Sequence, residues 1–158
     1  MKPSPLLIGF LTGLGMIAAI LAGYQEFLTD VITAQWIAYG VYAIGVTVAI
    51  YLNKLEANKF GDFFSLGFKS FIITTLVLVI FTAIFNYLHP EIARESAELF
   101  KTDLMKAQNR TPAEIEQDVK LYQDGFATAI ISRSIFGYLV FGALASAISS
   151  LLLTLQKR

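Results

Sequence analysis

The chain has no cysteine and a single histidine among its 158 residues. Without cysteine there can be no disulfide, no thiolate chemistry and no iron–sulfur ligation. One imidazole cannot build a zinc site without further ligands, and His89 has only Glu91 close by in sequence. We therefore expect no metal and no cofactor, and assign His89 an interfacial or capping role.

Charge is also scarce. Only 15% of residues are charged, and the 12 basic and 12 acidic side chains cancel, so nothing indicates a nucleic-acid surface. Four apolar stretches have no Asp, Glu, Lys or Arg through their centres, and each approaches the ~20 residues that cross a ~30 Å hydrocarbon core. The sequence thus predicts an all-α integral membrane four-helix bundle forming one domain over residues 1–158, with spans at about 6–24, 36–52, 66–88 and 134–155.

Catalytic patterns are missing as well. No Asp, Glu, Lys, Arg or His side chain lies deep in a span, and no Gly-x-Ser-x-Gly motif, paired intramembrane carboxylates or phosphate-cradling loop occurs. We predict that the protein is not an enzyme. The first apolar run exceeds a typical signal-peptide core of about 7 to 15 residues, so we expect it to be a retained span.

Lysine and arginine mark alternate connections, and short basic loops stay cytoplasmic during insertion. Basic residues precede the first span, lie between spans two and three, and close the chain, whereas the other two connections are acidic on balance. This distribution predicts cytoplasmic termini and an external long segment. The phenylalanine-rich stretch from Phe60 to Phe68 is either a short interfacial segment or the first turns of span three, with Asp62 as an N-cap candidate.

Small residues recur at four-residue spacing in the first and last spans. Such spacing lets helix backbones approach closely in lipid, where no hydrophobic drive brings helices together. We predict helix packing within the bundle, although self-association of copies would use the same pattern. The candidate packing residues are Gly9, Gly13, Gly142, Ser146 and Ser150.

Residues 90–126 read as an external amphipathic helical hairpin between spans three and four. Thr111, Pro112 and Glu114 form a capping box with proline at the first helical position. The hairpin either docks a partner or only caps the bundle, and Gly125 could bend its second helix before span four. The docking hypothesis rests on the acidic Glu95 and Glu98 and on an apolar stripe that includes Ile115, Val119 and Tyr122.

Arg133 lies at the predicted outer end of span four. Its side chain either extends to the lipid headgroups or pairs with Glu26 or Asp30 of the first external link. Polar residues on span three, together with Asn53, form a candidate polar seam, although helical hydroxyls often bond their own backbone. The seam residues on span three are Thr74, Thr75, Thr82 and Asn86.

Several of these features together resemble the bacterial membrane family called domain of unknown function 4199, seen mainly in Bacteroidota. They are the glycine-rich first span, the segment Lys59-Phe60-Gly61-Asp62-Phe63-Phe64-Ser65-Leu66-Gly67-Phe68-Lys69, the Pro90 turn, the acidic Thr111-Pro112-Ala113-Glu114-Ile115-Glu116 and the small-residue last span. The resemblance implies the inner membrane of a Gram-negative bacterium and provides no catalytic residues to carry over.

The functional hypothesis is therefore a non-enzymatic accessory or scaffold subunit with a periplasmic hairpin. Its expected partners are membrane lipid and a membrane or periplasmic protein, with no nucleic acid, and its oligomeric state stays open. The alternative is a small channel or transporter formed by self-association, with the polar seam of span three lining a shared path.

Overall fold

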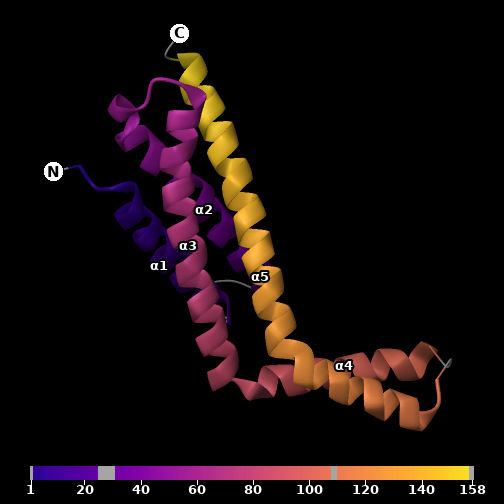
Figure 1. The fold of residues 1–158 in the computed structure, drawn as a ribbon. Helices are drawn as coiled ribbons and strands as arrows, with labels where there is room; N and C mark the ends of the chain where they lie inside the picture. The colour runs from indigo at the N-terminus through magenta and orange to yellow at the C-terminus, as the bar shows by residue number, and fades with distance from the viewer. Residues whose placement is uncertain (1, 25–30, 108–109, 157–158) are drawn as a thin grey trace. The chain divides into compact units, whose positions relative to one another are not determined.

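The computed structural model describes residues 2–24, 31–107 and 110–156, and within these ranges the chain is all-α, with no strand. Its elements are α1 (Pro5–Tyr24), α2 (Val31–Leu52), the 3₁₀ helix η1 (Lys54–Glu56), α3 (Phe60–Leu88), α4 (Pro90–Ala107) and α5 (Pro112–Gln156) (Figure 1). Four of them, α1, α2, α3 and α5, are long and apolar enough to cross a membrane. The prediction of four apolar helices is confirmed.

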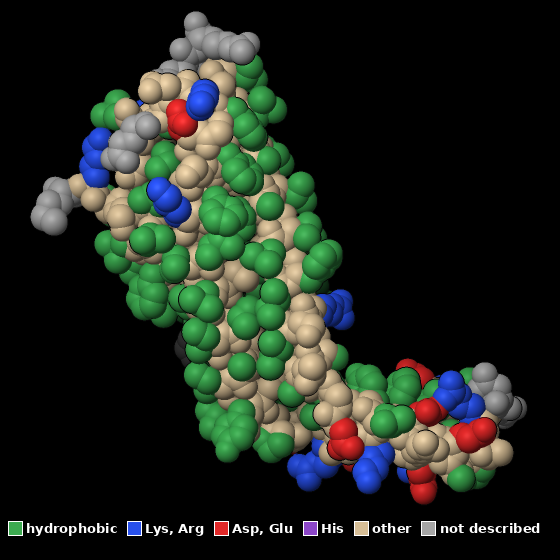
Figure 2. Space-filling model, in the orientation of Figure 1, with side chains coloured by type: hydrophobic (Ala, Val, Ile, Leu, Met, Phe, Trp, Pro, Cys, Tyr) green, Lys and Arg blue, Asp and Glu red, His purple; other side chains and the backbone are tan. Residues whose placement is uncertain are grey.

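These helices keep most of their apolar surface on the outside. In the most apolar stretch of each, 33% or less of the residues is buried inside the protein. Exposed hydrocarbon of this extent is compatible with a lipid environment. Figure 2 accordingly shows hydrophobic side chains over most of the visible face of α3 and of the C-terminal part of α5.

The chain divides into two compact units, one formed by residues up to 79 together with those from 135 onward, and one formed by Ile80–Ser134. In the first unit α1 packs along α2. Hydrogen bonds link α1 to α3, α2 to both α3 and α5, and α3 to α5. The core of the unit is a cluster of buried side chains that includes Met16, Tyr42, Val46, Phe63 and Leu78.

The N-terminal segment lies beside the end of α2, because the Asn53 side-chain amide donates to the Pro3 carbonyl at 3.3 Å. The beginning of α3 reaches the C-terminal half of α5, where the Ser146 hydroxyl donates to the Phe64 carbonyl at 3.3 Å. Helices α1 and α2, and likewise α3 and α5, therefore run in opposite directions within this unit.

Helix α3 begins at Phe60, so the phenylalanine-rich stretch forms its first turns. Asp62 is not the N-cap that we expected. It lies inside the first turn, and its carboxylate reaches back to accept hydrogen bonds from the backbone N–H groups of Asn58 and Lys59 at 3.0 and 3.2 Å. The carboxylate still satisfies N–H groups at the start of the helix, which is the function of a cap.

The second unit contains α4, the beginning of α5 and the last turns of α3. The rings of Phe100 on α4 and Tyr122 on α5 stack with centroids 4.6 Å apart. Ala97, Ile115 and Phe126 are buried in the same unit, and the Phe126 ring lies 6.0 Å from that of Tyr122. Helix α5 continues through Gly125 without a break, since one glycine in a helix costs only about 1 kcal/mol relative to alanine.

Candidate functional site

Tyr42 lies at the centre of the first unit, with 0% of its surface exposed. Its hydroxyl is 3.0 Å from the Thr75 hydroxyl and 3.2 Å from the Phe71 carbonyl, both on α3. It is also 3.1 Å from the Tyr138 carbonyl on α5. A phenol has one proton to donate, so the two carbonyls share it while the Thr75 hydroxyl can donate in return. One side chain of α2 is thereby bonded to two other helices.

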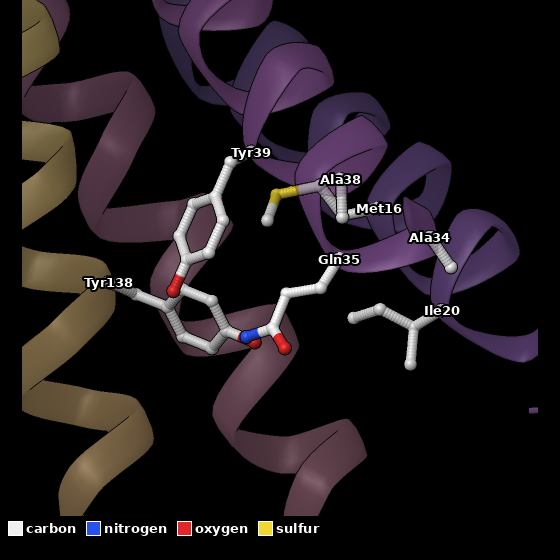
Figure 3. A pocket seen from close by; sticks show the side chains of 7 residues that line it. All are labelled: Met16, Ile20, Ala34, Gln35, Ala38, Tyr39 and Tyr138. Carbon is white, nitrogen blue, oxygen red and sulfur yellow. The ribbon is translucent and has the colours of Figure 1, made fainter. Parts of the chain in front are cut away.

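A pocket of about 150 Å³ lies close to this centre, between α1, α2 and α5 (Figure 3). Met16, Ile20 and two alanines of α2 provide its apolar wall. Its polar groups are the Gln35 amide and the hydroxyls of Tyr39 and Tyr138. In Figure 3 the end of the Gln35 side chain and the Tyr138 ring point toward one another.

The groups that line this pocket can donate and accept hydrogen bonds. Its lining contains an amide and two phenols but no carboxylate, imidazole or amine, so it holds no general acid–base pair matched to neutral pH. Its volume equals that of an engineered apolar cavity that holds benzene. The pocket has the size and polarity for one small ring with a polar substituent.

Sequence reasoning singled out none of Tyr39, Tyr42 and Tyr138. The position of Tyr42 within the span could have identified it, because Tyr42 lies almost one turn further into the span than Tyr39. A tyrosine that deep in an apolar helix needs a hydrogen-bond partner. The pattern could not identify that partner, which depends on how α2 is rotated against α3 and α5.

The predicted packing residues all lie at contacts inside the first unit. A β-carbon on Gly9 would collide with the Ser70 carbonyl, and one on Gly13 would come within 2.8 Å of the Val77 side chain. On α5, a β-carbon on Gly142 would meet the Tyr42 hydroxyl and the Phe71 ring. Ser146 and Ser150 are fully buried. These small residues let α1 and α5 approach their neighbours closely.

Four side chains of the proposed seam, all except that of Thr82, are bonded to backbone carbonyls or to Tyr42. Thr74 donates to Gly9 of α1 at 2.9 Å and to Ser70 of its own helix at 3.1 Å, while Thr75 contacts Tyr42. In the second unit the Asn86 amide donates to the Thr82 carbonyl at 2.8 Å. Asn53 donates to Ala49 at 3.0 Å as well as to Pro3. The seam residues of the first unit are thus part of its helix packing.

Arg133 is exposed on α5. Glu26 and Asp30, with which we expected it to pair, lie outside the described residues. The ion pair therefore stays a prediction, as does the extension of Arg133 to the headgroups.

The docking residues predicted for the second unit separate into two groups. Ile115 is buried, Val119 is half-buried and Tyr122 stacks on Phe100, so the apolar stripe faces α4. Glu95 and Glu98 are exposed on α4. The apolar side chains that face outward are ones that the sequence did not single out: Leu99 is 70% exposed, Leu121 64% and Met105 55%.

Charged side chains gather on this unit, on α4 and the neighbouring part of α5 (Figure 2). Arg110 forms an ion pair with Asp118, and Lys106 is 3.5 Å from Asp103. His89 Nδ1 lies 2.7 Å from Glu91 Oε1. The pKa of Glu91 is lowered by its own backbone N–H and by this contact with His89. Among the described residues no three His, Cys, Asp or Glu side chains are grouped to hold a metal ion.

The capping box at the start of α5 has the predicted geometry. The Thr111 backbone N–H donates to Glu114 Oε2 at 2.7 Å, and the Thr111 hydroxyl donates to the same oxygen at 2.8 Å. The Glu114 N–H in turn reaches the Thr111 hydroxyl at 3.4 Å. The pKa of Glu114 is lowered by these bonds, the backbone N–H contributing most, with help from the nearby Arg110.

This cap leads to a prediction about pH. A carboxyl whose pKa is lowered by folding stabilises the fold above its ordinary pKa, and that contribution disappears as pH falls through the lowered value. Acidification below the usual glutamate range should therefore fray the first turn of α5. Amide hydrogen exchange, corrected for intrinsic rates, should show protection of residues 114–117 falling with acid in the native chain. Glu114→Gln should remove most of this pH dependence, and Glu116→Gln, an exposed control, should leave it unchanged.

No family model, curated protein or solved structure matches the chain. The functional conclusion therefore depends on the residues and on their arrangement.

Proposed function

We propose that the protein is embedded in a membrane through α1, α2, α3 and the C-terminal part of α5, with both termini cytoplasmic and with α4 and the beginning of α5 outside. The apolar lengths support this: α1 has 20 residues and α2 has 22, which at about 1.5 Å per residue match a ~30 Å core. The contact of Asn53 with Pro3 supports a common side for the N-terminal segment and the end of α2. That side carries Lys2, Lys54 and Lys59, as the positive-inside rule requires.

We further propose that the membrane is the inner membrane of a Gram-negative bacterium, which places α4 and the beginning of α5 in the periplasm. The support is the resemblance to domain of unknown function 4199 over Lys59–Lys69, Pro90 and Thr111–Glu116. The test is the topology of the chain in such a bacterium. A reporter that is active only in the periplasm should be active after residue 107 and inactive after residue 57 and at the C-terminus. The opposite pattern would overturn the orientation.

The activity that we propose is that of a non-enzymatic accessory or scaffold subunit. The observation that carries it is the surface of the second unit, where the strongly exposed Leu99, Met105 and Leu121 accompany the acidic Glu95 and Glu98. The two helices already bury their own apolar stripe against each other. Exposed leucine beside charge, on a unit with its own small core, is typical of a protein contact surface with an apolar centre and a polar rim.

The test is cross-linking of the full chain in native membranes. A photoreactive residue at position 99 or 121 should link to one foreign protein, whereas the same residue at Asp124, which is exposed on the same unit, should link much less. Joint reversal of charge at Glu95 and Glu98 to lysine should lower the yield about tenfold at low salt, because charges at the edge of an interface act on encounter. Charge reversal at Asp124 is the matched control.

Two outcomes would contradict this proposal. Equal labelling from all three positions would mean that no specific surface exists. Links only between copies of the chain, at a defined oligomer mass, would favour the channel or transporter. In that case, replacing Thr75, Thr82 and Asn86 by apolar residues should abolish flux through reconstituted vesicles.

A further inference from the structure

A second, larger hollow lies between α2 and α5, on the surface of the first unit. It measures about 630 Å³ and opens outward. Small residues, Ala43 on α2 and Ala145 on α5, leave room for it, and leucines border it, among them Leu144 and Leu152. Both helices are proposed spans, so this groove faces the hydrocarbon of the membrane if the proposed embedding holds.

The polar groups in the groove are already satisfied. The Thr47 hydroxyl donates to the Ala43 carbonyl at 2.8 Å and lies 2.8 Å from the Ser149 hydroxyl, which can donate to it. Each hydroxyl therefore has a partner before any ligand arrives. A hydrocarbon chain can cover them without breaking a hydrogen bond, so the groove suits an apolar occupant.

One end of the groove has a different character. Tyr51 and Gln156 line it there, and the Lys54 ammonium lies 3.8 Å from the centre of the Tyr51 ring. A phenol, an amide and an ammonium can all donate hydrogen bonds to phosphate oxygens, and the ammonium favours a negative headgroup. This is the end that the lysine distribution assigns to the cytoplasmic side, where anionic lipids attract basic residues.

The length of the groove fits a lipid as well. Its α5 wall runs from Phe141 to Gln156 and so rises about 22 Å at 1.5 Å per residue. One leaflet is about 15 Å thick, half of a ~30 Å core. A single acyl chain would extend along this wall while its phosphate remains beside Tyr51 and Lys54.

We propose that the α2–α5 groove binds one anionic phospholipid, with an acyl chain over Thr47 and Ser149 and its phosphate held by Lys54, Tyr51 and Gln156. The proposal rests on the membrane embedding but not on the scaffold role, because it needs no protein partner. It differs from general solvation by lipid in that one molecule is retained and its headgroup charge matters.

The probe is phosphatidylglycerol, compared with phosphatidylcholine of the same acyl chains, added to the purified full chain in mild detergent and followed by native mass spectrometry. We expect a one-to-one adduct, with phosphatidylglycerol retained at least fivefold better. Lys54→Gln should reduce this preference about fivefold, in line with about 1 kcal/mol for one basic residue near an anionic surface. Lys59→Gln, which changes an exposed lysine in the same connection, should leave the preference intact.

A second variant tests the apolar part. Ala145→Phe would fill the groove and should lower retention of both lipids at least fivefold, whereas Leu76→Phe, on an exposed position of α3, should not. Circular dichroism establishes that each variant is folded, and Lys54→Gln decides the headgroup claim even if Ala145→Phe does not fold.

Three results would overturn the proposal. If the two lipids were retained equally and Lys54→Gln did not change this, the claim of a headgroup site would be wrong. If Ala145→Phe folded and still retained lipid as the native chain does, the groove would not be the binding site. A dimer that Ala145→Phe dissociates, without lipid adducts, would make the occupant a second copy of the chain. Failure of the embedding itself is distinguishable, because the chain would then be released from membranes by alkaline carbonate.

Discussion

Replacing Gly9 by alanine should lower the free energy of unfolding of the first unit by about 3 kcal/mol. The added β-carbon would collide with the Ser70 carbonyl and lie about 3.0 Å from the neighbouring backbone carbons of that residue. Backbone of a packed helix cannot yield as a side chain can, so α1 must move away from α3. Overpacking of this kind costs about 1–3 kcal/mol. The separation would also weaken the 2.9 Å bond from Thr74 to the Gly9 carbonyl, worth about 1 kcal/mol.

The measurement is reversible unfolding in mixed micelles, followed by circular dichroism as the denaturing detergent is increased. Gly40→Ala is the matched control, since no atom outside its local backbone lies within 4 Å of the new carbon. Alanine favours helix over glycine, so this control should unfold at the same point or slightly later. If Gly9→Ala behaved like Gly40→Ala, the close approach of α1 to α3 would be wrong.

The glycines of α1 show which features of the fold the sequence could predict. Charge-free apolar length was sufficient for four membrane-crossing helices, because that signal lies in consecutive residues. Four-residue spacing indicated that Gly9 and Gly13 share a smooth helix face. It could not indicate that this face meets Ser70 and Val77 of α3, since pairing depends on the order and rotation of the helices.

The second unit shows the same limit. The capping box at Thr111 and Glu114 was readable because its partners lie three residues apart. The spacing of Ile115 and Tyr122 predicted an apolar stripe, but it could not predict which surface covers that stripe. Two surfaces, a neighbouring helix and another protein, can bury the same stripe, and in the structure it faces α4 through Phe100. The exposed Leu99 and Leu121 do not belong to a helical repeat of apolar residues, so the search for such repeats did not identify them.

Tyr42 is the residue whose truncation should destabilise the first unit most. Tyr42→Ala removes a fully buried ring and leaves a cavity, and loss of a large aromatic side chain typically costs about 3–5 kcal/mol. The variant should also separate α2 from α3 and α5, because the hydroxyl that joins them is gone. Unfolding in mixed micelles measures the loss, and chemical cross-links between α2 and α5 should decrease in parallel.

Smaller changes isolate the hydrogen bonds from the packing. Tyr42→Phe keeps the ring and should cost about 1 kcal/mol. Thr75→Val removes the partner hydroxyl, and the double variant should show a coupling of about 0.6 kcal/mol, with an upper limit near 1.7 kcal/mol for such bonds in membranes. Tyr87→Phe, at a position 83% exposed, should change nothing. Additive effects of Tyr42→Phe and Thr75→Val would mean that the two hydroxyls do not bond. The three-helix junction would then depend on ring packing alone, and Tyr42→Ala would still be severe.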